Sequence, residues 1–264
     1  MKRKKLPSIF AASVFLLLPF LSQSQTGKAK REFYQLTVYH FSNAAQEKVL
    51  DNYLQNALLP ALHRMNIKSA GVFKSLANDT AKIKSLYLLI PFSSAEMIVT
   101  IPAKLNADKQ YQTDGTEYIN AEYKTPPYDR MENIVLQAFP LAPKMQLPQL
   151  KSERKERVYE LRSYESSTEK IYANKVQMFN DGDEIGLFKR LGFNAIFYGE
   201  VLAGSKMPNL MYMTSFENMD ERNAHWKSFV DDPHWKKLIA MPEYKNNISH
   251  IDIMFLRPTD YSDY

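Results

Sequence analysis

Five side chains in the second half of the chain have the types and spacing for ligand binding or proton transfer. Glu160, Arg162 and Tyr164 alternate along one predicted strand, so their side chains share a face. His250 and Asp252 alternate in the same way along the last predicted strand. An arginine, a histidine and two carboxylates in one cavity could bind an anionic or enolic ligand and shift a pKa for proton transfer.

The facing of these strands decides what the five residues can reach. Alternation places Tyr159 and Leu161 on the opposite face of the first of these strands, and their apolar character suits a core covered by helices. We therefore expect the polar set to line the open face of the sheet, with His250 and Asp252 as the catalytic candidates. The expected ligand-binding residues are Glu160, Arg162, Tyr164, Tyr198 and Tyr212.

The same residues also fit a structural role. Glu160 and Arg162 could form an ion pair that stabilises the sheet, and His250 could bond Asp252 or a strand neighbour. Structural ion pairs and functional ones have the same appearance in a sequence. Both interpretations stay open at this point.

Other kinds of chemistry find little support. The chain has no cysteine, which excludes disulfides, thiolate metal ligands and cysteine nucleophiles. His225 and His234 flank Trp226 and Trp235 without a third ligand at metal-site spacing, so we expect no metal site there, and the helical phase of the tryptophans predicts core positions. Motifs for a serine nucleophile, a phosphate-binding loop and a dinucleotide are missing from the sequence, so no cofactor is expected.

The second half is predicted to fold as a βαββαβ module. Its strands are expected at residues 157–164, 193–201, 210–216 and 248–256, with helical regions after the first and third. The first helical region is interrupted at 180–183. Asn218 with Glu221 three residues later is a capping box, and Asp232-Pro233 is a helix start. This order is that of a ferredoxin-like α+β module.

The first half is predicted to be a degenerate copy of the same module. Residues 140–156 contain three prolines and a charged run, which predicts a linker between modules at 33–139 and 157–257. Tyr159 follows Tyr34 by 125 residues in strands of similar spelling, and two later segments match at nearly the same offset. The second helical region of this half is expected to break at Pro102. Its expected interior residues are Gln35, Thr37 and Tyr39.

The motifs of the second half resemble those of the NIPSNAP family. They are Tyr159-Glu-Leu-Arg162-Ser-Tyr164 on the first strand and, after the third, Arg222, Trp226, Phe229, Asp232-Pro233 and Trp235. The first half follows the pattern only in outline, since Thr37 stands where the motif has arginine and both tryptophans are missing. The resemblance implies a dimeric α+β barrel, which two copies in one chain could close between themselves. It implies no defined reaction, although related barrels include cofactor-independent monooxygenases and haem-binding enzymes.

The N-terminus has the pattern of a secretory signal peptide. Basic residues at 2–5 precede an apolar stretch, and small residues suit a cut after Ser24, which predicts a signal peptide at 1–24 and a periplasmic or secreted protein. An uncleaved anchor is disfavoured because Pro19 interrupts a stretch shorter than the roughly 20 residues that span a bilayer. Removing these four basic residues lowers the net charge from +5 to +1, which argues against nucleic-acid binding.

Three classes of function remain. The first is an exported protein that binds a small molecule in the barrel interior. The second is a cofactor-independent monooxygenase or isomerase acting on a planar, enolisable substrate, with His250 or Asp252 as base and Arg162 holding the anion. The third is a structural or partner-binding module. A homo-oligomer is compatible with all three, and no stable membrane anchor is expected after cleavage.

Overall fold

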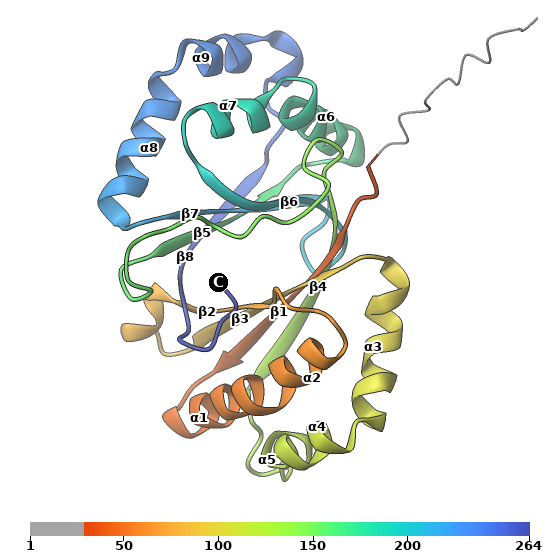
Figure 1. The fold of residues 1–264 in the computed structure, drawn as a ribbon. Helices are drawn as coiled ribbons and strands as arrows, with labels where there is room; N and C mark the ends of the chain where they lie inside the picture. The colour runs from red at the N-terminus through yellow and green to blue at the C-terminus, as the bar shows by residue number, and fades with distance from the viewer. Residues whose placement is uncertain (1–28) are drawn as a thin grey trace, which may run out of the picture.

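A computed structural model describes residues 29–264 and shows one closed barrel of eight antiparallel strands (Figure 1). The predicted signal peptide at 1–24 lies outside the described residues. The strands are β1 (Phe33–Phe41), β2 (Gly71–Ser75), β3 (Lys84–Phe92), β4 (Arg130–Ala138), β5 (Val158–Glu165), β6 (Asn194–Ala203), β7 (Asn209–Phe216) and β8 (His250–Pro258). Around the barrel they follow the order β1-β3-β2-β8-β5-β7-β6-β4.

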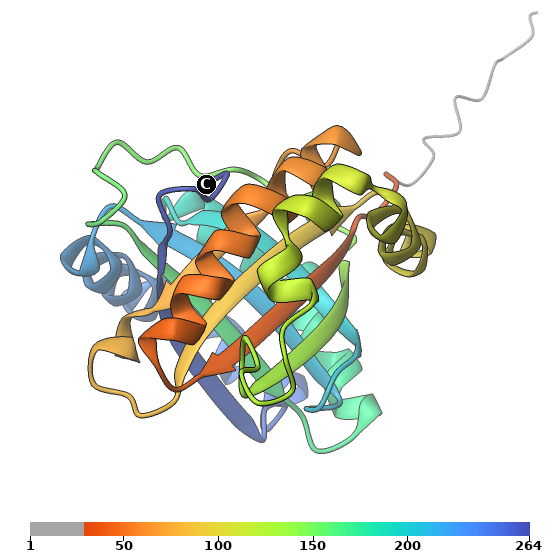
Figure 2. The same cartoon turned by 90° about the horizontal axis from the view of Figure 1, so that it is seen from below.

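Helices cover the barrel in two separate layers (Figure 1). The first half contributes α1 (Ala44–Tyr53), a π-helical turn (Leu54–Leu58), α2 (Leu59–Arg64), α3 (Ala95–Ala107), α4 (Lys109–Asp114) and α5 (Thr116–Ile119). The second half contributes α6 (Glu169–Asn180), α7 (Glu184–Arg190), α8 (Met219–Asp231) and α9 (Pro233–Ala240). Figure 2 shows α1 lying over the strands of the first half. Between residues 29 and 264 we find no helix with the length and apolar character to cross a membrane.

The barrel closes within the single chain. Within each half the first strand lies between the fourth and the third, giving β4-β1-β3-β2 and β8-β5-β7-β6. The halves then join through two antiparallel pairings, β2 with β8 and β4 with β6. The predicted α+β fold, with ferredoxin-like halves that close as an intrachain barrel, is thereby confirmed. Closure pairs each of these eight strands on both sides, so the sheet formed by residues 29–264 has no open edge.

The facing predicted for the first strand of each half is wrong. Tyr159 and Leu161 point into the barrel interior, where Leu36 and Val38 meet them from β1. On β1, Tyr39 instead belongs to the core under the helices of the first half. Gln35 and Thr37 also lie on that outer face, bonded to Asn133 on the neighbouring strand. The interior is apolar because both first strands turn their more hydrophobic alternate positions inward, as the packed centre of a small barrel requires.

Local sequence signals set most helix ends correctly. The Asn218 side chain accepts a hydrogen bond from the Glu221 amide at 2.9 Å, and Asp232 accepts one from the His234 amide at 2.8 Å. The predicted interruption at 180–183 is present, with Asp183 in the left-handed region at φ 61°. The predicted break at Pro102 is wrong, because α3 runs through this proline and ends before Asp108, which caps α4.

One end of the barrel is sealed by two irregular segments. The linker packs Met145 and Leu150 against the interior side chains. Tyr264 is buried beside Phe73 and Tyr159, with ring centroids 5.4 Å and 6.3 Å away. A cavity inside the barrel is therefore to be expected only near the opposite end.

Candidate functional site

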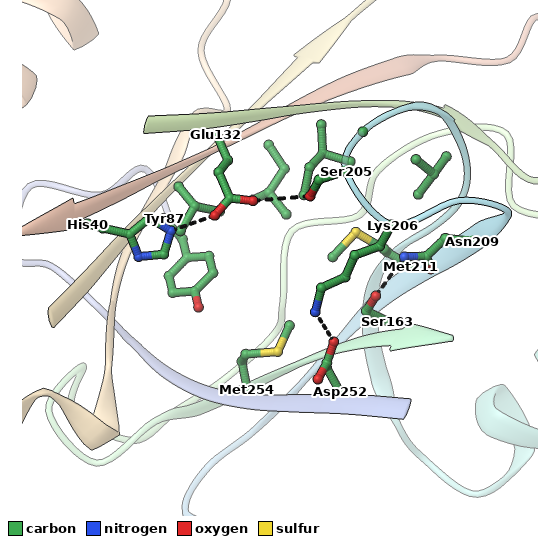
Figure 3. Close-up of a pocket in the computed structure, with 15 residues that line it drawn as sticks. His40, Tyr87, Glu132, Ser163, Ser205, Lys206, Asn209, Met211, Asp252 and Met254 are labelled. Atoms are coloured by element: carbon green, nitrogen blue, oxygen red, sulfur yellow. Dashed lines mark hydrogen bonds and ion pairs between the residues drawn. The ribbon is translucent and has the colours of Figure 1, made fainter. Parts of the chain in front are cut away.

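A cavity of about 210 Å³ lies at the unsealed end of the barrel, where β1 ends and β4 and β8 begin (Figure 3). Both halves of the chain build it. Its apolar lining comprises Leu36, Val38, Tyr87, Ile134, Val201, Gly204, Met211 and Met254. Its polar lining comprises His40, Glu132, Ser163, Ser205, Lys206, Asn209 and Asp252. The cavity thus combines an apolar wall with polar groups, which is typical of small-molecule sites.

Strand alternation explains how the polar groups reach the mouth of this pocket. His40 follows the inward-facing Leu36 and Val38 at steps of two residues on β1. Glu132 on β4 and Asp252 on β8 each stand two residues before an apolar lining residue. Each of these strands therefore places its polar inward position near the solvent end and its apolar one deeper.

Glu132 is held by a histidine and a serine. His40 Nε2 lies 2.8 Å from Glu132 Oε1, and Ser205 Oγ donates to Glu132 Oε2 at 3.3 Å. Partial burial acts to raise the pKa of the Glu132 carboxyl, but the hydrogen bond and charge of His40, with the serine, hold it below its ordinary value. Glu132 is therefore an ionised acceptor at neutral pH.

Asp252 lies on the other side of the mouth and pairs with Lys206 from the β6–β7 hairpin (Figure 3). His250 Nε2 also lies 3.1 Å from Asp252 Oδ1. Partial burial acts to raise the pKa of Asp252, but the contacts with Lys206 and His250 hold it below its ordinary value. Of the two predicted catalytic candidates, Asp252 lines the cavity, whereas the His250 side chain is 59% exposed and is not part of the lining.

Tyr87 brings a neutral hydroxyl to the same space. Its side chain lines the cavity and is largely buried. Burial raises the pKa of Tyr87 above its ordinary value; the Ser85 side chain acts to lower it, and the charges of Glu132 and Asp252 act to raise it. The hydroxyl therefore stays protonated at neutral pH and can donate a hydrogen bond to a bound molecule.

The five predicted ligand-binding residues do come together, but on the opposite face of the sheet, under α7 and α8. Arg162 donates from Nε to Glu160 Oε1 at 2.7 Å and from Nη1 to the Tyr164 hydroxyl at 2.8 Å. The Tyr164 and Tyr212 hydroxyls are 2.9 Å apart, and Tyr198 stacks on Tyr212 at 5.7 Å between ring centroids. The prediction that they line the barrel interior is wrong.

Helix α8 supplies the partners that explain this facing. Arg222 donates to both carboxylate oxygens of Glu160 at 2.8 Å, and Trp226 Nε1 donates to Oε2 at 2.7 Å. The Arg162 guanidinium lies over the Trp226 ring, 3.7 Å from its centroid. Arg222 and Trp226 are four residues apart and therefore share one helix face, a spacing that could have identified them as partners of a buried carboxylate.

These bonds favour the structural interpretation of the motif residues. Glu160 is fully buried and accepts from three side chains, so it has no free face for a ligand. Burial raises the pKa of Tyr164, Tyr198 and Tyr212 above the usual tyrosine value, which keeps these hydroxyls neutral. The cluster fixes α8 to β5. A ligand-binding role for it stays a prediction that no contact supports.

One group of side chains at the rim has the chemistry to approach a metal ion. Glu165, His250 and Asp252 each offer a ligand atom, and these atoms lie within 4.8 Å of one another. The ammonium of Lys206 already forms an ion pair with Asp252, however, so a metal ion would have to displace this ammonium. His225 and His234 do not converge, since they bond the carbonyl oxygens of Glu221 and Gly182 instead.

Comparison with known proteins identifies the second half of the chain and the fold of the whole. The NIPSNAP family model matches residues 159–263, which confirms the resemblance predicted from the motifs. A structure of a candidate monooxygenase from Lactobacillus acidophilus covers 86% of this chain and 94% of its own, with 12% identity and a TM-score of 0.56. Another from Fusobacterium nucleatum covers 87% and 93%, with 7% identity and a TM-score of 0.55. At these identities the similarity to the two structures shows a shared fold. A search of curated proteins found no match to the sequence.

Proposed function

We propose that this chain, in which residues 159–263 carry a NIPSNAP domain, binds a small and mostly apolar molecule in the barrel pocket. The observation that carries the proposal is the cavity itself, apolar along its wall and polar at its mouth. Its volume of about 210 Å³ is below the roughly 300–1,000 Å³ of sites for drug-sized ligands. The pocket therefore suits a compound of one or two rings.

The contrast between the two ends of the barrel supports binding over a purely structural role. Small barrels normally fill their interior with side chains. The sealed end does so, with Tyr34, Phe73, Tyr159 and Tyr264 packed together. The other end is not filled and leaves a cavity. Polar groups from several strands and a hairpin line this cavity.

Filling the pocket is expected to abolish ligand binding without unfolding the protein. Gly204 lines the cavity, and a Cβ added there meets only ordinary contacts, at 3.4 Å from Ile134 and Val201. In a thermal-shift screen of one- and two-ring compounds, a ligand at 100 times its Kd stabilises the native state by about 2.7 kcal/mol. We expect Gly204→Leu to lose this shift while retaining its own melting transition.

Ala224→Leu is the matched control for that variant. It adds the same apolar side chain at an exposed position of α8, away from the pocket, and is expected to keep the ligand-induced shift. If no compound of this size raises the melting temperature of the unaltered protein, the proposed function is wrong.

A second candidate function is a cofactor-independent oxygenase or isomerase that uses the same pocket. It is favoured by Asp252 and Glu132, two ionised carboxylates beside an apolar cavity, either of which could accept a proton from a substrate. The earlier form of this hypothesis, with Arg162 holding an anion, is wrong because Arg162 lies on the outer face of the sheet. Oxygen uptake or isomerisation with hydroxylated aromatic substrates, lost in the double variant Glu132→Gln/Asp252→Asn, is the expected result. Oxygen uptake and isomerisation rates equal to those without protein would contradict it.

Export and self-association are further proposals, motivated by the sequence. Cleavage after Ser24 would give a mature protein that begins at Gln25, which N-terminal sequencing of the processed protein would test. Because one chain already closes the barrel, a homo-oligomer would have to form through other surfaces.

A further inference from the structure

Two carboxylates face each other across the mouth of the pocket. Glu132 and Asp252 are the third residues of β4 and β8, and Figure 3 shows them on opposite sides of the open space. Both are ionised at neutral pH, since their hydrogen-bonded partners outweigh the effect of burial. An ionised carboxylate only accepts hydrogen bonds. A ligand that reaches the polar end of the pocket must therefore supply hydrogen-bond donors to these carboxylates.

The basic side chains at the mouth already interact with these two carboxylates. Among the lining residues Lys206 is the one lysine or arginine, and it pairs with Asp252. His40 directs Nε2 to Glu132, and its Nδ1 lies 3.3 Å from Ser85 Oγ. A ligand carboxylate would thus lie near two carboxylates of the same charge. To pair with the Lys206 ammonium, it would have to replace Asp252 as the partner of that ammonium. Like-charge contact in a partly desolvated site disfavours such a ligand.

Tyr87 adds a donor beside these acceptors. It stays protonated and lies close enough for both Glu132 and Asp252 to raise its pKa. A ligand oxygen next to it could accept from the tyrosine while donating its own proton to a carboxylate. A hydroxyl does both, whereas an ether or a carboxylate oxygen only accepts.

We infer that the pocket selects ligands that carry a phenolic or enolic hydroxyl at the polar end of a one- or two-ring apolar body, and that it rejects the corresponding carboxylates. This inference rests on the proposed ligand-binding function. It assigns one of the two carboxylates, Glu132 or Asp252, as the acceptor of the ligand hydroxyl and Tyr87 as its donor. It also narrows the ligand class expected from the sequence, which included anions.

Three naphthalene derivatives of similar shape test the inference by calorimetric titration of the full chain at pH 7. The hydroxyl probe is 2-naphthol, the carboxylate probe is 2-naphthoate and the probe without a donor is 2-methoxynaphthalene. We expect 2-naphthol to bind about 10- to 100-fold more tightly than either of the others, as for a hydrogen bond to a charged group. The double variant Glu132→Gln/Asp252→Asn is expected to lose this preference, and Glu96→Gln, at an exposed position of α3, to retain it.

Each alternative outcome has a separate meaning. Equal binding of 2-naphthol and 2-methoxynaphthalene would overturn the inference while leaving the proposed ligand-binding function intact. Tightest binding of 2-naphthoate would overturn it in the same way. If none of the three compounds binds the unaltered protein, both the inference and the proposed function fail. A double variant that still prefers 2-naphthol would remove Glu132 and Asp252 from the assignment.

Discussion

Glu160→Ala is expected to lower the free energy of unfolding by about 3–5 kcal/mol, as for removal of one partner of a buried ion pair. The carboxylate accepts from Arg162, Arg222 and Trp226, all within 2.8 Å. Its loss leaves two guanidinium groups without their counter-charge and an indole N–H without its acceptor in a water-poor environment. Since domains are stable by only about 5–15 kcal/mol, this is a large fraction of the total. Urea denaturation followed by tryptophan fluorescence measures it.

Glu153→Ala is the control for this variant. Glu153 pairs with Lys155, and both side chains are more than 70% exposed, at 74% and 71%. Exposed pairs contribute little, so the control is expected to stay within about 0.5 kcal/mol of the unaltered protein. An effect of Glu160→Ala as small as that of the control would mean that α8 is not fixed to β5 through this carboxylate.

The same residue gives the protein a defined sensitivity to acid. Burial acts to raise the pKa of Glu160, but the hydrogen bond from Arg222 and the charges of Arg162 and Arg222 hold it below the ordinary value of 4.5. A carboxyl whose pKa is lowered by folding stabilises the native state above its unfolded pKa and loses that contribution as the pH falls through the folded one. Stability should therefore decline below about pH 4.5, and less steeply in Glu160→Gln.

The Glu160 cluster also shows which feature of β5 the sequence could not predict, namely which of its two faces lies under the helices. Alternation along β5 correctly separated Tyr159 and Leu161 from Glu160 and Arg162, but it could not say which set faces the helices. The apolar set goes into the barrel, because the interior of a closed barrel excludes water as fully as a helix-covered face does. The polar set goes under α8, where that helix supplies hydrogen-bond partners. Assigning polar residues to the more open face failed because this barrel has no open face.

The pocket could be predicted only in part, because most of its polar residues lie far apart in the chain. Asp252 was identified from the last strand, and its neighbour His250 lies at the rim. His40, Glu132 and Lys206 come from two other strands and a hairpin of both halves, far apart in the chain. The pairing of β1 with β4 brings His40 to Glu132, and the pairings of β2 with β8 and β4 with β6 bring the two halves of the site together. No local spacing encodes such a site, whereas helix ends depend on a few neighbouring residues and were predicted well.

A second buried charge pair lies in the same helix-covered core. The Lys175 side chain on α6 is only 2% exposed, and its Nζ donates to Glu184 Oε2 on α7 at 2.8 Å. The ammonium also lies 4.6 Å from the centroid of the Phe179 ring. Neither Lys175 nor Glu184 lines the barrel pocket. The pair therefore holds α6 to α7 across the interruption at 181–183, and its removal should affect stability and leave the pocket intact.

Lys175→Met is expected to lower the free energy of unfolding by about 3–5 kcal/mol, because it leaves the Glu184 carboxylate buried without a counter-charge. Replacing both partners, as Lys175→Met/Glu184→Leu, should recover most of this loss, since apolar residues of similar volume remove the uncompensated charge. Denaturant unfolding of the two single variants and the double variant completes a mutant cycle. The exposed pair of Lys227 with Asp231 is the control, and Lys227→Met should change stability by no more than about 0.5 kcal/mol. A double variant less stable than either single variant would contradict the account, because the two losses would then add and neither would come from leaving its partner without a counter-charge.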